Sequence, residues 1–135
     1  MFNATGYTAM TKLNLGDKFD TSKVTDMVAM FQNTGYTLMT ELNLGNKFDT
    51  SNVTNMKSMF SYTGYESMTT LNFGKKFTIS NGANTQYIFY NCGTNGKLTS
   101  VIVHNEALKT KILGLGNNNV PSWWNTNNIV IVQSN

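Results

Sequence analysis

The hydrophobic positions of this chain follow two patterns that alternate along the sequence. In the first, Met10-x-x-Leu13-x-Leu15, the two leucines flank a polar residue and therefore lie on one face of a short strand. The second runs from Val24 to Phe31, with apolar residues at positions i, i+3, i+6 and i+7, which is the spacing of one stripe of a helix. Together they predict one strand followed by one short helix.

Both patterns return every 29 residues, so the chain contains an internal repeat. Residues 1–29 and 30–58 are identical at 20 of 29 positions. The third copy, 59–87, keeps the strand pattern but loses part of the helical pattern, and a half-copy starts at residue 88. When one residue of this half-copy is skipped, its apolar side chains align with the strand pattern at Leu98, Val101 and Val103.

The repeat predicts an α/β repeat solenoid of the leucine-rich-repeat type, with one strand and one short helix per 29-residue coil. Neither element can bury its apolar side alone, so neighbouring coils must stack. We expect the solenoid to occupy residues 1–103, with coils starting near residues 1, 30, 59 and 88. In the helix of the first coil, we expect Thr21 or Ser22 to cap the N-terminus and Asp20 to lie near the positive end of the dipole. We expect a glycine to end the helix of each coil. Those glycines are Gly6, Gly35, Gly64 and Gly93.

The segment 104–135 departs from the repeat and is predicted to form a C-terminal cap of one helix and one strand. Residues 105–113 read as a short amphipathic helix with Asn105 as its N-cap, followed by a polar loop over 117–122. The β-branched run 128–133 predicts a strand. We expect Trp123 and Trp124 to cover the open end of the last coil, with a partner contact as the alternative.

The sequence begins in the middle of a repeat, because Met1 occupies the same column as Met30 and Met59. We therefore expect a monomeric fragment of a longer chain that carries more repeats upstream.

Composition narrows the function classes. Charged residues make up only 13% of the chain, and 20 Asn and 19 Thr supply most of its polarity. The net charge of +3 comes from lysines alone, and the absence of arginine weighs against nucleic acid as a partner. One Cys and one His exclude an internal disulfide and a metal cage of these ligands, and nothing indicates a cofactor. No apolar run approaches the roughly 20 residues needed for membrane insertion.

The phrase F-D-T-S-N-V-T-N-M-K-S-M-F, residues 48–60, closely resembles the tandem unit of the BspA-like bacterial surface-protein repeat family. The tail, V-x-V-x-N-E-A-L-K-x-K-I-L followed by W-x-x-x-N-I-V-I-V, is similar to the cap that follows such arrays. The resemblance implies a leucine-rich-repeat-like solenoid on a secreted or wall-anchored protein, with a role in adhesion or host interaction. It brings no catalytic residues.

The exposed face of the predicted sheet is the candidate binding surface. In a leucine-rich-repeat geometry, the residues between the inward apolar positions point outward and form a shallow polar face. Threonines beside the strands would complete this polar surface, at Thr11, Thr40, Thr69 and Thr99. The alternative for the asparagine column is a ladder of amides that bond along the stack and only stabilise it. The candidate partner-binding residues are Lys12, Asn14, Glu41, Asn43, Thr70 and Asn72.

Other columns are better explained by structure than by chemistry. We expect the tyrosine column (Tyr7, Tyr36 and Tyr65) to cover the helix-to-strand turn, with glycan or protein contact as the alternative. The Met and Phe columns belong to the core. Asp20 and Asp49 lie in one column, where helix N-terminal duty is favoured over Ca²⁺ binding. Cys92 and His104 are weak candidates for a catalytic dyad.

The sequence therefore predicts a non-enzymatic, extracellular or cell-surface interaction module that binds a host protein or glycan through its sheet face. The alternative is a structural spacer that presents an upstream adhesive region. A binding face should vary between coils, whereas a spacer should repeat itself. The column of Lys12 varies and the column of Asn14 does not, so both hypotheses stay open.

Overall fold

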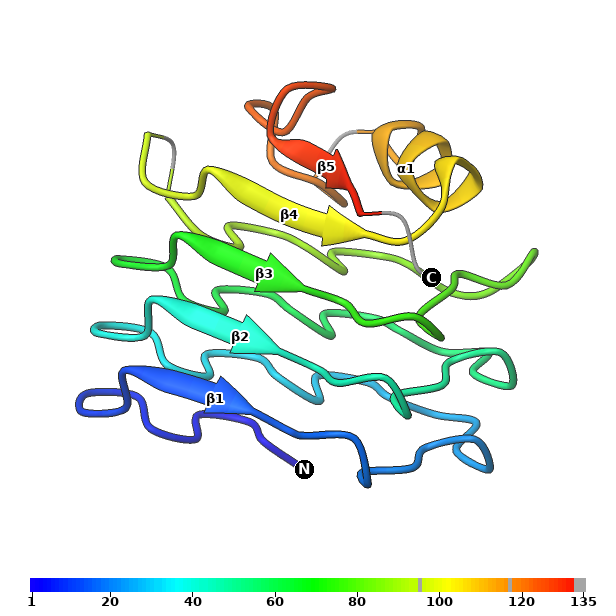
Figure 1. Cartoon of the computed structure of the whole chain (residues 1–135), viewed down its shortest axis with the longest axis horizontal. Helices are drawn as coiled ribbons and strands as arrows, with labels where there is room; N and C mark the ends of the chain where they lie inside the picture. The colour runs from blue at the N-terminus through cyan, green and yellow to red at the C-terminus, as the bar shows by residue number, and fades with distance from the viewer. Residues whose placement is uncertain (95, 117, 133–135) are drawn as a thin grey trace.

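One parallel sheet runs along the whole molecule in the computed structural model, which describes residues 1–94, 96–116 and 118–132. Its strands are stacked in chain order (Figure 1). They are β1 (Lys12–Asn14), β2 (Glu41–Asn43), β3 (Thr70–Asn72), β4 (Ser100–Val103) and β5 (Ile129–Ile131). Leu13 pairs with Leu42 and Leu42 with Leu71, whereas Leu71 pairs with Val101, one residue later than the 29-residue period. The predicted solenoid of one strand per coil, with its extra residue in the fourth copy, is confirmed.

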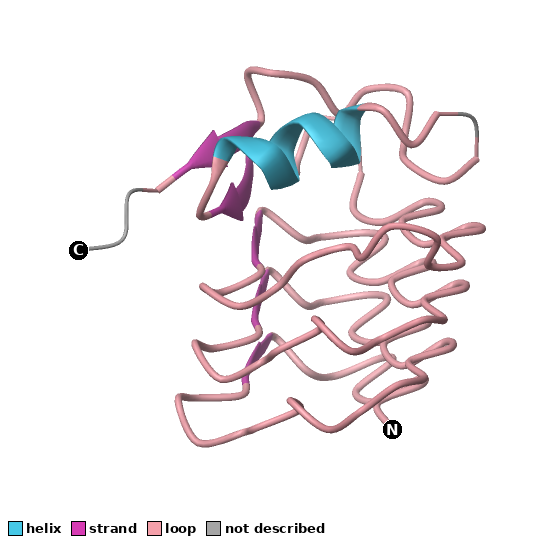
Figure 2. Cartoon of the chain, turned by 90° about the vertical axis from the view of Figure 1, so that its right-hand side faces the viewer, coloured by secondary structure: helices cyan, strands magenta, loops and turns pink. Residues whose placement is uncertain are grey.

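β2 and β3 bury their central residue more deeply than the two residues beside it. Leu42 and Leu71 are fully buried, while the residues that flank them in β2 and β3 are only partly buried. Figure 2 shows the strands in line on one side of the stack, with the turns of each coil extending away from them. The alternation predicted from Leu13-Asn14-Leu15 is therefore confirmed, because successive side chains of a strand point to opposite faces.

The short helix predicted in every coil is wrong: among the described residues, the coils themselves contain only strands, bridges and turns. The N–H groups of Met27, Ala29 and Phe31 donate to carbonyls of the next coil at 2.8–2.9 Å. Between them, the N–H groups of Met30 and Gln32 each donate to the residue three places back, at 3.2 Å. A helix would direct every amide to the fourth residue back. Here alternate amides bond to the neighbouring coil instead.

Local sequence also opposes a helix in this segment. Ala29 and its counterpart Ser58 have positive φ angles of 53° and 56°, which right-handed helices do not contain. Thr, Ser, Asn and Val, which are frequent here, are weak helix formers. Successive turns closed by bonds to the third residue back place buried side chains at a spacing similar to that of a helical stripe. Met27, Met30 and Phe31 are therefore core residues, as predicted, but on turns.

After β2 and β3, each coil approaches the preceding one so closely that a side chain is excluded there. A Cβ added to Gly45 would lie 1.9 Å from the carbonyl oxygen of Gly16, and one added to Gly74 would lie 1.9 Å from that of Gly45. Both glycines also have positive φ angles, of 79° and 75°. Gly45 and Gly74 are therefore restricted to glycine by contact between coils as well as by backbone conformation.

The interior is built from columns of identical side chains. Phe2, Phe31, Phe60 and Phe89 stack along the axis with ring centroids 5.2, 5.3 and 5.4 Å apart. Full burial of each such ring contributes about 1.5–3 kcal/mol. The Met and Phe columns predicted as core are buried in the second and third coils.

The C-terminal segment covers the fourth coil with helix α1 (Glu106–Leu113) and strand β5. Asn105 accepts a hydrogen bond from the N–H of Leu108 at 2.8 Å, as expected of an N-cap. Trp124 is 5% exposed and packs on Phe89 with ring centroids 5.0 Å apart. The predicted helix, its cap and the covering role of Trp124 are confirmed. The observed strand β5 is shorter than the predicted strand 128–133. Residue 117 of the predicted loop and residue 133 of the predicted strand lie outside the described residues.

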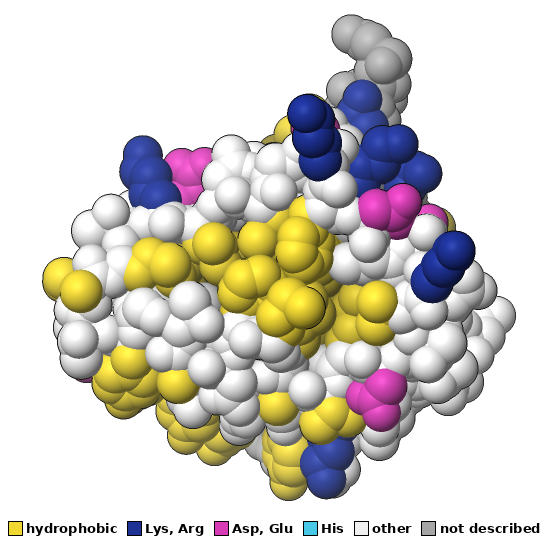
Figure 3. Space-filling model, turned by 90° about the horizontal axis from the view of Figure 1, so that it is seen from below, with side chains coloured by type: hydrophobic (Ala, Val, Ile, Leu, Met, Phe, Trp, Pro, Cys, Tyr) yellow, Lys and Arg dark blue, Asp and Glu magenta, His cyan; other side chains and the backbone are white. Residues whose placement is uncertain are grey.

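The opposite end of the stack is open. Figure 3 views the molecule from the β1 side and shows hydrophobic side chains gathered near the centre of this face. The first coil contributes partly buried apolar residues there, namely Phe2, Met10, Leu13, Leu15 and Phe19.

Candidate binding surface

The structure brings together all six residues predicted to form the exposed sheet face, which we call the sheet face. Lys12, Glu41 and Thr70 align in register across β1, β2 and β3. Asn14, Asn43 and Asn72 align in the same way two positions later. The six side chains therefore form two parallel columns on one surface.

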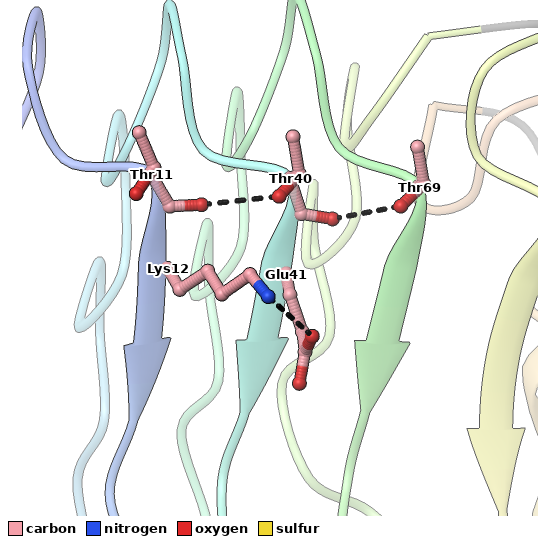
Figure 4. Close-up of polar contacts among 5 residues, drawn as sticks. All are labelled: Thr11, Lys12, Thr40, Glu41 and Thr69. Carbon is pink, nitrogen blue, oxygen red and sulfur yellow. Dashed lines mark hydrogen bonds and ion pairs between the residues drawn. The ribbon is translucent and has the colours of Figure 1, made fainter.

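The first column contains an ion pair. Lys12 Nζ lies 3.9 Å from Glu41 Oε2, and the two side chains are 69% and 41% exposed (Figure 4). Pairs this exposed contribute about 0–1 kcal/mol to stability. The two charges are therefore available to a partner at little cost to the fold.

The threonines beside the strands bond along the stack instead of pointing freely to solvent. The hydroxyl of Thr40 donates to the carbonyl of Thr11 at 3.3 Å, and that of Thr69 donates to the carbonyl of Thr40 at 3.1 Å (Figure 4). Thr99 continues the column to Thr69 at 3.4 Å. The sequence placed these residues in the polar surface, and the structure gives their hydroxyls a stacking role.

The asparagine column does not form the amide ladder considered above. Asn14 Oδ1 accepts from the N–H of Gly16 at 2.9 Å, and the bonds of Asn43 to Gly45 and of Asn72 to Gly74 measure 3.0 and 2.9 Å. Each asparagine side chain thus closes a local turn with the N–H of the residue two positions later. Within the part of the chain that the structure describes, the three Nδ2 groups make no hydrogen bond, so each keeps two donors for another molecule.

These amides line a groove of about 320 Å³ at the ends of the strands. Sequence reasoning missed its other polar residues: a second column, Asp17, Asn46 and Lys75, and also His104 at the end of β4. Asp17 Oδ1 accepts from the N–H of Asn46 at 3.2 Å, which ties two coils together. The signal was present, because this column differs in all three coils while its neighbours repeat.

A family model described as "Mycoplasma protein of unknown function, DUF285" matches residues 1–111, most of the chain. The chain belongs to this family. No curated protein and no solved structure matches it. The DUF285 match covers the stacked coils, the sheet face and most of α1, so every candidate residue of the groove lies inside it.

In this DUF285 chain, the carboxylates of Asp20 and Asp49 each close a local turn. Asp20 Oδ1 and Asp49 Oδ1 accept from the N–H groups of Ser22 and Ser51, both at 2.9 Å. Hydrogen bonding from the backbone and side chain of Ser22 lowers the pKa of Asp20, and that from the side chain and backbone of Ser51 lowers the pKa of Asp49. The predicted helix N-terminal duty is wrong because no helix follows. Among the described residues, no cluster of three or more His, Cys, Asp and Glu is placed to hold a metal ion.

The candidate dyad has no nucleophile in this geometry. Cys92 is fully buried, and burial raises the pKa of its thiol far above the ordinary value. A nucleophilic cysteine needs a thiolate, which this site disfavours. His104 lines the groove at the sheet edge.

In the described ranges, no helix is long and apolar enough to cross a membrane.

Proposed function

We propose that this chain is a non-enzymatic interaction module that binds a protein or glycan partner through its sheet face. The row of three asparagine amides carries the proposal. Their Oδ1 atoms are fixed by glycine N–H groups, so their Nδ2 donors are held in one orientation along a groove. Donors fixed in advance lose little entropy on binding, which favours recognition of a polar partner.

The location of this activity is part of the same proposal. The repeat phrase of residues 48–60 resembles that of BspA-like bacterial surface proteins, and that resemblance supports an extracellular or cell-surface protein with a role in adhesion. The varied column Asp17, Asn46 and Lys75 adds to this support, since a recognition surface is expected to differ between coils.

A structural spacer is the second candidate, and a specific observation favours it. The bond from each asparagine to its glycine explains the repeated Asn without any ligand. The threonine column serves stacking in the same way. In this case the solenoid holds an adhesive region at a distance and its sheet face contacts nothing.

Binding of the purified chain to immobilised mucin, extracellular-matrix proteins and glycans separates the two candidates. The diagnostic variant is Asn43→Asp, which keeps an acceptor for the N–H of Gly45 and removes the Nδ2 donors. Asn84→Asp is the matched control, because Asn84 accepts from the N–H of Gln86 at 3.0 Å in a turn outside the sheet.

Saturable binding that is weakened in Asn43→Asp and retained in Asn84→Asp supports recognition by the sheet face. Equal binding by wild type and Asn43→Asp contradicts it. If the chain is folded by circular dichroism and binds nothing on the panel, the spacer is favoured.

A further inference from the structure

A break in the tyrosine column creates a second candidate site, away from the sheet face. Tyr7 and Tyr36 stack with ring centroids 4.7 Å apart, and Tyr36 and Tyr65 follow at 5.0 Å. The fourth coil places Thr94 in this column, directly after its glycine. Since threonine has no ring, the stack ends at Tyr65. Thr94 donates its hydroxyl to the carbonyl of Tyr65, which fixes the end of the column.

The space left by the missing ring is a pocket of about 440 Å³. Tyr65 and Trp123 supply its aromatic surface, and Thr94 and Gly93 are among its small lining residues. Trp123 reaches this place because the C-terminal segment folds back over the fourth coil (Figure 1). The pocket therefore depends on both the repeat and its cap.

Trp123 is held firmly by its neighbours. Its carbonyl accepts hydrogen bonds from the side-chain amides of Asn125 and Asn128, both at 3.1 Å. Its ring packs edge-on against Trp124 with centroids 6.2 Å apart, and Trp124 is in turn buried against Phe89. An aromatic surface fixed in this way is ready for a flat ligand without reorganisation.

The polar lining of the pocket consists of Glu66, Asn91 and Lys97. Lys97 Nζ donates to the main-chain carbonyl of Glu66 at 2.7 Å. The carboxylate of Glu66 makes no ion pair within the described ranges, so it can accept hydrogen bonds from a ligand. Asn91 adds an amide with both donors and an acceptor. One negative and one positive group leave the pocket without net charge.

We propose that this pocket binds a neutral six-membered sugar ring. The C–H face of such a ring is apolar and packs on aromatic side chains, while its hydroxyls donate to carboxylates and accept from amides and ammonium groups. Because the lining holds one negative and one positive group, the pocket has no net charge to attract a phosphate or carboxylate ligand. A wholly apolar ligand would strip water from three polar side chains. A concave site with aromatic surface and a few convergent polar groups is typical of small-molecule binding.

The test is a titration of the whole chain with sugars, followed by saturation-transfer NMR on the sugar protons. Methyl α-glucoside and methyl β-galactoside represent sugars at the end of a glycan, and glucose, galactose and N-acetylglucosamine represent free sugars. Glucose 6-phosphate is the charged probe. We expect saturable binding of at least one neutral sugar with a Kd on the order of millimolar, as suits one open aromatic pocket.

Two variants locate the binding. Trp123→Ala should weaken it by about tenfold through loss of the aromatic surface. Glu66→Gln keeps the size of the side chain, removes its charge and should weaken binding severalfold. Glu106→Gln, in the exposed first turn of α1, is the matched control and should bind as wild type does. If Trp123→Ala does not fold, Glu66→Gln decides alone.

The proposal is overturned if the folded chain binds none of the neutral sugars, if Glu66→Gln binds them as tightly as wild type, or if glucose 6-phosphate is preferred. It does not rest on the sheet face. The sheet-face proposal is read from the immobilised panel and Asn43→Asp, so each proposal can fail without the other.

Discussion

The two ends of this solenoid carry the same repeat but differ in what covers them. At the C-terminal end, Val101 of β4 and Ile129 of β5 pair and are both fully buried. Helix α1 and strand β5 lie over this end of the stack (Figure 2). At the other end, Leu13 is only partly buried, although its equivalents Leu42 and Leu71 are fully buried. The same residue in similar local sequences therefore has different environments, depending on whether coils stack on both sides of it.

The difference teaches that stability in this fold belongs to interfaces between coils. Alternate amides of a coil donate to the following coil, and threonine hydroxyls donate to the preceding one. A substitution should therefore be costly in proportion to the coils that it touches, as in other one-dimensional repeats. Pairs of equivalent positions at the open end and in the interior test this directly.

The largest difference in the free energy of unfolding is expected between two glycine-to-alanine substitutions, one in the interior and one at the open end. Gly45→Ala places a Cβ 1.9 Å from the carbonyl oxygen of Gly16, whereas a Cβ on Gly16 meets nothing within 4 Å. We expect Gly45→Ala to cost more than about 4 kcal/mol or to prevent folding, because a backbone clash between coils cannot relax locally. Gly16→Ala should cost about 1–2 kcal/mol from its positive φ alone. Urea denaturation followed by circular dichroism measures both.

Gly74→Ala is the check on this pair, since its Cβ would meet the carbonyl oxygen of Gly45 at 1.9 Å. It should behave as Gly45→Ala does. Equal stability of the Gly16 and Gly45 variants would show that the backbone angle alone determines the cost and would contradict the interface argument.

A smaller difference is expected in the leucine column. Leu42→Ala removes a fully buried side chain and should cost about 2–5 kcal/mol. Leu13→Ala removes a partly exposed one and should cost less than about 2 kcal/mol. The midpoint of urea unfolding should fall accordingly, with Leu71→Ala matching Leu42→Ala. If Leu13→Ala is as costly as Leu42→Ala, the open end is buried in solution and the comparison between the ends is wrong.

The strands and their columns could be predicted from sequence because alternation along a strand is local. That is why Lys12, Asn14 and their equivalents lie on the sheet face as expected. The turns of the coils could not be predicted from the hydrophobic spacing, since a stripe at i, i+3, i+6 and i+7 is shared by a helix and by stacked turns. The bonds between coils, such as that from Met27 to Asn55, and the positive φ angles of Ala29 and Ser58 distinguish the two.

The rest of the candidate sites depends on how distant segments meet. Asp17 and His104 share a groove because the chain turns at the glycines that follow β1, β2 and β3 and because β4 ends beside those turns. Tyr65 and Trp123 share a pocket because the cap folds back over the fourth coil. Column patterns identify which residues repeat, but they do not indicate which nonrepeating residue will lie beside them.

The smallest effect is expected where a bond is local, and there the open end and the interior should agree. Asp20 in the first coil and Asp49 in the second each accept a hydrogen bond from the N–H of the serine two residues on, and both carboxyls have a lowered pKa.

A carboxyl whose pKa is lower in the folded state stabilises the fold above its unfolded pKa, about 3.9 for Asp. That stabilisation is lost as the pH falls through the lower, folded value. Asp20→Asn and Asp49→Asn keep an acceptor for the serine N–H but lose the carboxylate's contribution, so both should be slightly less stable than wild type at neutral pH. Both should also lose less stability than wild type does below about pH 4, by similar small amounts. Urea midpoints measured at pH 7 and at pH 3 compare them, with Asp26→Asn, another exposed turn carboxylate, as the control. A much larger effect for Asp49 than for Asp20 would mean that even these local bonds depend on the neighbouring coil.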